Sequence, residues 1–107
     1  MRNLIDVIDE MLSVIPKKEN SLIVFLEDVK ESQRVRAPED MTGWWEISEK
    51  LDRMLYKYDK LTETLRRMLK PLLTPPDWQL KLYSIFTTKT LEETLEEIEK
   101  NIYGYSG

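Results

Sequence analysis

A heptad pattern of apolar residues in the middle of the chain is the feature that most constrains its fold. Nine apolar residues recur there at alternating spacings of three and four: Trp44, Ile47, Leu51, Met54, Tyr58, Leu61, Leu65, Met68 and Leu72. This spacing places all of their side chains on one stripe of an α-helix. The pattern predicts an all-α fold, namely a four- or five-helix bundle built around one long central helix over residues 43–70.

Periodicity and helix-ending residues predict the remaining helices. The first covers residues 3–15 and ends before Pro16. The second covers residues 21–34, although the apolar run 22–26 would also suit a buried strand. We favour a helix because charged residues follow and no partner strand is available. Two capping patterns, residues 74–77 with Thr74 as the cap and residues 90–93, predict the last two helices, with Leu91 on the apolar stripe of the final one.

Length and composition predict a single domain over residues 1–107. The longest uninterrupted apolar run is five residues, which is far too short to span a bilayer, and the amino-terminal stretch lacks the pattern of a signal peptide. Cysteine is absent, which fits a reducing compartment. We therefore expect a cytoplasmic protein.

The residue types that carry most enzyme chemistry are missing. The chain has no histidine and no cysteine, which excludes the common catalytic triads and most zinc sites. It also lacks a glycine-rich phosphate loop. The pairs Glu92/Glu96 and Glu93/Glu97 lie opposite the predicted apolar stripe of the last helix, so we expect them to face solvent. The sequence predicts no catalytic residue, metal, cofactor or small-molecule ligand.

The long helix suggests an interaction surface. About 27 residues make a rod of roughly 40 Å, whereas a compact chain of this length is roughly 34 Å across. The domain is therefore elongated, or the end of the helix packs on a second copy or another protein. The candidate contact residues are Trp45, Tyr58, Leu61 and Leu65. Trp45 lies off the stripe, and either the 35–42 loop covers it or it contacts a partner.

These observations predict a non-catalytic protein–protein interaction module, such as an adaptor, a small regulator or a subunit, that could also form a homodimer. One alternative is a nucleic-acid-associated regulator that uses a basic edge of the long helix. That edge consists of Lys50, Arg53, Lys57, Lys60 and Arg67, to which Arg34 and Arg36 could be added. Acids one turn earlier pair with several of these bases, which is typical of a solvated helix face. A further alternative is an acidic inhibitor of a basic partner, based on the glutamates of residues 92–99.

The heptad pattern generates a prediction at Leu61, the middle of the stripe. A charged side chain on a buried stripe is strongly unfavourable, so Leu61→Asp should unfold the domain or dissociate an oligomer. Circular dichroism and native mass would measure both outcomes. A folded Leu61→Asp variant of unchanged native mass would contradict the heptad interpretation.

Overall fold

The computed structural model describes residues 2–59, 68 and 75–103. Within this part of the chain every regular element is a helix and no strand occurs. The helices are α1 (Leu4–Val14), α2 (Asn20–Arg34), α3 (Thr42–Asp59), α5 (Asp77–Thr87) and α6 (Leu91–Tyr103). The predicted all-α class is confirmed, and residues 21–26 are helical rather than extended.

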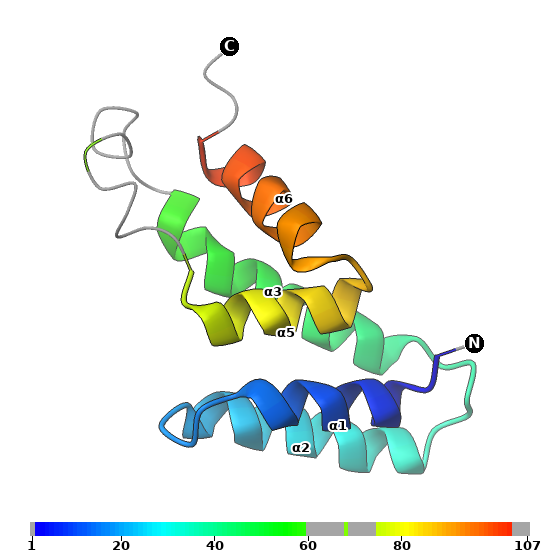
Figure 1. Ribbon diagram of the computed structural model, residues 1–107. Coiled ribbons are helices and arrows are strands. Elements are labelled where there is room, and N and C mark those ends of the chain that lie inside the picture. The colour runs from blue at the N-terminus through cyan, green and yellow to red at the C-terminus, as the bar shows by residue number, and fades with distance from the viewer. Residues whose placement is uncertain (1, 60–67, 69–74, 104–107) are drawn as a thin grey trace.

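Helices α1 and α2 form a hairpin at the base of the molecule (Figure 1). Helix α1 begins where the side chain of Asn3 accepts a hydrogen bond from the backbone N–H of Ile5, at 2.8 Å. It ends at an extended residue immediately before Pro16, as the proline predicts. An ion pair of 2.6 Å between Lys30 and Asp9 joins the outer faces of the two helices.

The five helices form a closed circuit of neighbours, in which each packs chiefly against two others. Helix α1 contacts α2 and α5, α2 contacts α3, α3 contacts α6, and α6 contacts α5 (Figure 1). The molecule is elongated, with extents of 48 × 29 × 22 Å and a radius of gyration of 15.1 Å. A compact chain of this length would have a radius of gyration near 13 Å.

One hydrophobic core lies inside this circuit. Its most deeply buried residues come from α1, α2, α3 and α5: Ile8, Met11, Leu26, Ile47 and Leu82. The periodicity predicted for residues 3–15 and 21–34 is confirmed, because the buried residues recur at helical spacing: Leu4, Ile8, Met11, Ile15, Leu22, Leu26 and Val29, with Phe25 only partly buried. Most of the buried side chains are apolar and recur at helical spacing, so burial of apolar surface holds the circuit together.

The predicted long helix is described only over its first part. Helix α3 covers Thr42–Asp59, and its apolar stripe packs on the core through Trp44, Ile47, Leu51 and Met54. The predicted continuation toward residue 70 lies outside the described residues except at Met68, which is helical and 71% exposed. A bundle arranged around a long central helix is therefore not established by the described residues.

The starts of two helices differ from the prediction. Helix α3 begins at Thr42, one residue before the predicted start, and the backbone N–H of Trp45 donates to the carbonyl of Met41, at 3.1 Å. Helix α5 has Pro76 at its cap position, without a side-chain cap, and the predicted cap Thr74 lies outside the described residues. The cap pattern of α6 is confirmed by reciprocal hydrogen bonds between Thr90 and Glu93.

The inward face of α6 also differs from the prediction. Leu91 was expected on the buried stripe but is 47% exposed, while Thr94 and Ile98 are buried. Leu91 is the first residue of the helix, whereas Thr94 and Ile98, farther along it, line a pocket with residues of α3 and α5. Thr94 tolerates burial because its hydroxyl donates to the carbonyl of Thr90, at 2.8 Å.

Gly43 is the point of closest approach between α3 and the α1–α2 hairpin. A Cβ atom built there would lie 2.5 Å from Cδ2 of Leu4, 3.1 Å from Oε1 of Gln33 and 3.3 Å from Cγ1 of Val29. Glycine therefore allows the helix backbone to pack directly on the hairpin.

Gly43→Ala should destabilise the domain. Alanine is the better helix former by about 1 kcal/mol, but overpacking a core typically costs about 1–3 kcal/mol. We expect a net loss of about 1 kcal/mol in the free energy of unfolding, measured by urea denaturation. Leu4→Val removes the closest atom, so the double variant should be more stable than the sum of the two single effects predicts. An unchanged or raised stability of Gly43→Ala would show that the hairpin moves aside without loss.

Candidate functional site

The candidate site lies at the start of α3, where two consecutive tryptophans have different surroundings. Trp44 faces the core, with its ring centroid 5.7 Å from that of Phe86 and the guanidinium of Arg2 5.4 Å from its ring. Successive helical residues point about 100° apart, so Trp45 is turned away from these contacts and is 71% exposed. Met41, four residues earlier, is 49% exposed. Two large apolar side chains therefore face solvent at the same end of α3.

The loop between α2 and α3 does not cover Trp45. Pro38 instead lines a pocket together with Trp44, and Trp45 is not among the residues that line this pocket. Arg36 forms an ion pair of 3.6 Å with Glu46, which ties the loop to the first turns of α3. Of the two alternatives for Trp45, the structure shows an exposed side chain and not one covered by the loop.

Asp40 fixes the entry of the chain into α3. Its Oδ1 accepts hydrogen bonds from the side-chain hydroxyl of Thr42, at 2.6 Å, and from the backbone N–H of Thr42, at 2.8 Å. These two bonds, the hydroxyl first, and the nearby charge of Arg36 hold the pKa of the Asp40 carboxyl below its ordinary value. Met41 lies between Asp40 and Thr42 in the sequence, so the hydrogen bonds that join these two residues also determine the position of Met41.

The other predicted partner-contact residues are not brought to this site by anything the structure describes. Tyr58 lies within α3, but its side chain is not described. Leu61 and Leu65 lie outside the described residues. Among the four predicted contact residues, Trp45 is the only one whose side chain the structure describes.

The predicted basic edge of α3 is described at two of its five residues. Lys50 is partly buried, with its Nζ 5.5 Å from the ring of Phe25, and Arg53 forms an ion pair with Glu49. The side chain of Lys57 is not described, and Lys60 and Arg67 lie outside the described residues. The two described charges of this edge, those of Lys50 and Arg53, interact with side chains of the same chain. This is typical of a solvated helix face.

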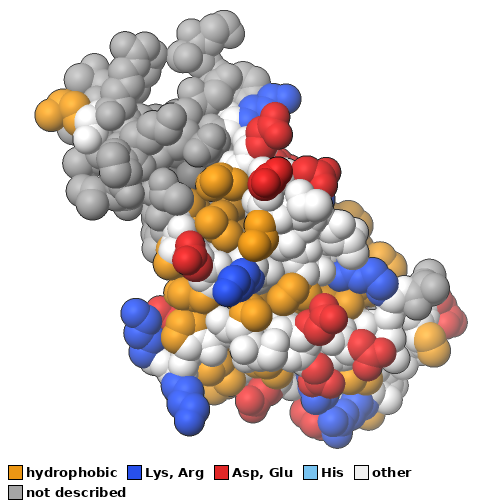
Figure 2. All heavy atoms as spheres, in the orientation of Figure 1, with side chains coloured by type: hydrophobic (Ala, Val, Ile, Leu, Met, Phe, Trp, Pro, Cys, Tyr) orange, Lys and Arg blue, Asp and Glu red, His pale blue; other side chains and the backbone are white. Residues whose placement is uncertain are grey.

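Acidic side chains gather over α6 (Figure 2). Glu92, Glu93, Glu96 and Glu97 are all exposed. Glu93 closes the capping box with Thr90, and Glu97 forms an ion pair with Lys89. For Glu92 and Glu96 no ion pair with another described residue is found. Two of the four glutamates therefore have a structural role, since Glu93 caps the helix and Glu97 pairs with Lys89.

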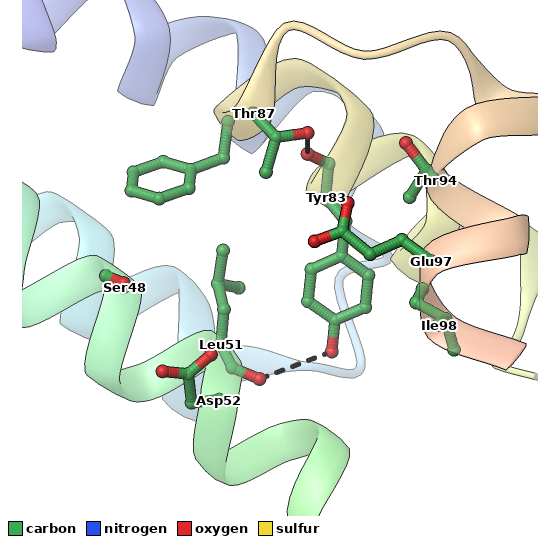
Figure 3. A pocket seen from close by; sticks show the side chains of 9 residues that line it. Ser48, Leu51, Asp52, Tyr83, Thr87, Thr94, Glu97 and Ile98 are labelled. Atoms are coloured by element: carbon green, nitrogen blue, oxygen red, sulfur yellow. Dashed lines mark hydrogen bonds between the residues drawn. The ribbon is translucent and has the colours of Figure 1, made fainter. Parts of the chain in front are cut away.

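A pocket of about 130 Å³ opens between α3, α5 and α6. Figure 3 shows the ring of Tyr83 between Leu51 of α3 and Ile98 of α6, with the carboxylates of Asp52 and Glu97 on opposite sides. The hydroxyl of Tyr83 donates a long hydrogen bond of 3.5 Å to the carbonyl of Leu51.

The threonine hydroxyl groups of this pocket donate hydrogen bonds to backbone carbonyls of the preceding turn. Thr87 donates to the carbonyl of Tyr83, at 2.7 Å, and Thr94 donates to that of Thr90, at 2.8 Å. Both are bonds to the preceding turn, and neither hydroxyl donates to a carboxylate that could activate it as a nucleophile. The geometry of Thr87 and Thr94 therefore supports packing and not catalysis.

Sequence reasoning missed the polar and small residues around the start of α3. Gln33 is buried within α2, and Arg2 and Arg36 line a pocket beside Trp44. A glutamine one turn after a buried Val29 was a usable signal, because it continues the buried stripe of α2.

Among the residues that the structure describes, no cluster of acidic side chains could hold a metal ion. No helix in the same residues is long and apolar enough to cross a membrane. No protein-family model, no curated protein and no solved structure matches this chain.

The charge of Asp40 should stabilise the fold at neutral pH and not in acid. Because its pKa is lowered in the folded state, its contribution is present above the ordinary aspartate pKa of about 3.9 and is lost as the pH falls through the folded-state value. Asp40→Asn keeps an acceptor for Thr42 but removes the charge. Urea denaturation should show Asp40→Asn less stable than the parent at pH 7, and the difference should shrink toward zero in acid.

Glu39→Gln provides the matched control, because it removes a charge from the neighbouring exposed residue. It should leave the pH dependence of stability unchanged. An equal effect of Glu39→Gln and Asp40→Asn would show that net charge, and not the bonds to Thr42, is responsible.

Proposed function

We propose that this protein is a non-catalytic protein–protein interaction module, whose contact surface is centred on Trp45 at the start of α3. The observation that carries the proposal is the 71% exposure of the Trp45 side chain. Tryptophan buries a large area at low conformational cost and is enriched among the residues that dominate binding energy. Met41, which lies immediately before the first residue of α3, is also exposed.

Contacts of the two neighbouring residues support the proposal. Trp44 packs against the ring of Phe86, and Glu46 forms an ion pair with Arg36. These contacts restrain the turn of α3 that carries Trp45. A preorganised anchor loses little freedom on binding, which favours affinity.

We further propose that the partner can be a second copy of the chain. The support is the heptad pattern, which predicts that α3 continues to about residue 70 as the long central helix of a bundle, with Tyr58, Leu61 and Leu65 on a self-association seam. A twofold contact would bring the same surface from each copy together.

Trp45→Ala should weaken partner binding without unfolding the domain. Because the ring is largely exposed, its loss should change the free energy of unfolding by less than about 0.5 kcal/mol. Loss of an interface anchor is worth about 2 kcal/mol or more, which is at least about tenfold in affinity. Sedimentation over a range of concentrations measures self-association, and affinity capture from lysate with and without nuclease measures other partners.

Val24→Ala is the control, because it removes exposed apolar surface from α2 instead of α3. It should bind like the parent. A Trp45→Ala variant that binds as the parent does would contradict a surface centred on Trp45. Captured material that disappears with nuclease, or with rising salt, would instead favour nucleic-acid binding.

A further inference from the structure

We propose that the pocket between α3, α5 and α6 binds a lysine or arginine side chain of a partner protein. The pocket has a volume of about 130 Å³. This is below the roughly 300–1,000 Å³ of sites for drug-sized molecules, so the pocket suits one side chain and not a large cofactor. The inference rests on the proposed function, because the cation is assigned to a partner protein, but it does not require Trp45 to be the anchor.

The wall of the pocket is largely apolar. Leu51 of α3, Tyr83 and Phe86 of α5 and Ile98 of α6 line it, and Figure 3 shows the ring of Tyr83 between the side chains of Leu51 and Ile98. Lysine and arginine carry their charge on a stem of about three or four methylene groups, which packs along apolar surface while the charged end stays in water. The wall therefore fits the stem of a basic side chain.

The charges around the pocket favour a cation. The carboxylates of Asp52 and Glu97 lie on opposite sides of it (Figure 3), and none of its described lining residues is basic. Asp52 is exposed and forms no ion pair or hydrogen bond with another described residue. A cation that enters between the two carboxylates is attracted by both, whereas an anion would be repelled by both.

The carboxylate of Glu97 is only partly used within the chain. The Nζ of Lys89 contacts its Oε2, and Lys89 does not line the pocket. The two side chains of this ion pair are 42% and 48% exposed. Ion pairs that are exposed to this extent are weak. A second cation therefore has an acceptor at Glu97 as well as at Asp52.

The pocket opens on the same face of α3 as Trp45. Ser48 and Asp52, which line the pocket, follow Trp45 by three and seven positions, and this spacing places all three on one helix face. Seven residues of an α-helix advance roughly 10 Å, which an extended segment spans with about three residues. A partner segment that covers Trp45 would therefore carry its basic residue about three positions from that contact.

The test is an NMR titration of the protein with the blocked tripeptides Gly-Lys-Gly and Gly-Arg-Gly at constant ionic strength. The methyl groups of Leu51 and Ile98, which line the pocket, report on binding. We expect saturable shifts with at least one of the two peptides, and at least tenfold weaker binding when the basic residue is replaced by norleucine, which keeps a stem without the charge. Shifts that do not saturate, or equal binding of the norleucine peptide, would overturn the proposal. Spermidine that binds at least tenfold tighter than both basic peptides would overturn the assignment to a protein partner.

Asp52→Asn should weaken binding of the basic peptide about fivefold, the upper end for an exposed ion pair. The double variant Asp52→Asn/Glu97→Gln should weaken it at least tenfold. Glu49→Gln is the matched control, because Glu49 is an exposed acid of the same helix that pairs with Arg53 and does not line the pocket. Circular dichroism checks that each variant is folded, and Asp52→Asn alone decides if the double variant is not. An equal effect of Glu49→Gln and Asp52→Asn would show that net charge, and not the pocket, attracts the peptide.

Trp45→Ala separates this inference from the proposed function. Trp45 does not line the pocket, so this variant should bind the basic tripeptide as the parent does. If the tripeptides fail to bind while Trp45→Ala still weakens partner binding, the inference is wrong and the interaction surface stands. If the tripeptide binds while Trp45→Ala leaves partner binding unchanged, the pocket stands and the surface centred on Trp45 is wrong.

Discussion

The rest of the structure depends on the close approach of α3 to the α1–α2 hairpin at Gly43. A side chain there would collide with Leu4 and crowd Val29, so the helix backbone itself forms the contact surface. This contact fixes the depth at which α3 lies and also its rotation about its axis. Rotation decides that Ile47 and Leu51 enter the core. Every later contact of α3, with α6 and with the pocket beside Trp44, follows from that placement.

The same rotation separates the two tryptophans. Trp44 is directed at Phe86 and Arg2, where it closes the core and borders a cationic pocket. Trp45 is directed at solvent. Burying a side chain of this size is strongly favourable, so a fold that leaves one of two adjacent tryptophans outside retains a large unused binding energy. This is the physical basis on which an interaction module is proposed.

The sequence predicted those parts of the fold that depend on periodic burial and on local capping. The stripes of α1 and α2, and the box formed by Thr90 and Glu93, are consequences of neighbouring residues alone. The features that the sequence did not predict correctly depend on contacts between residues that are far apart along the chain. Leu91, the first residue of α6, is left 47% exposed by the described part of the chain. Gln33 is buried because Gly43, ten residues later, leaves room for it. Helix geometry placed Trp45 off the apolar stripe, but whether the loop before α3 covers it depended on the tertiary fold, as did the arginine-lined pocket beside Trp44.

The circuit of helices has a consequence for the order in which the chain assembles. Helices α1 and α2 are joined by a short turn, so their pairing closes only a small loop. The contact of α1 with α5 is of the opposite kind, since the bond from Arg2 to the carbonyl of Ile85 joins residues 83 positions apart. Contacts of such long sequence separation slow folding. We expect the docking of α5 to be the late step that converts an open hairpin into a closed domain, with α6 carried to its place by α5.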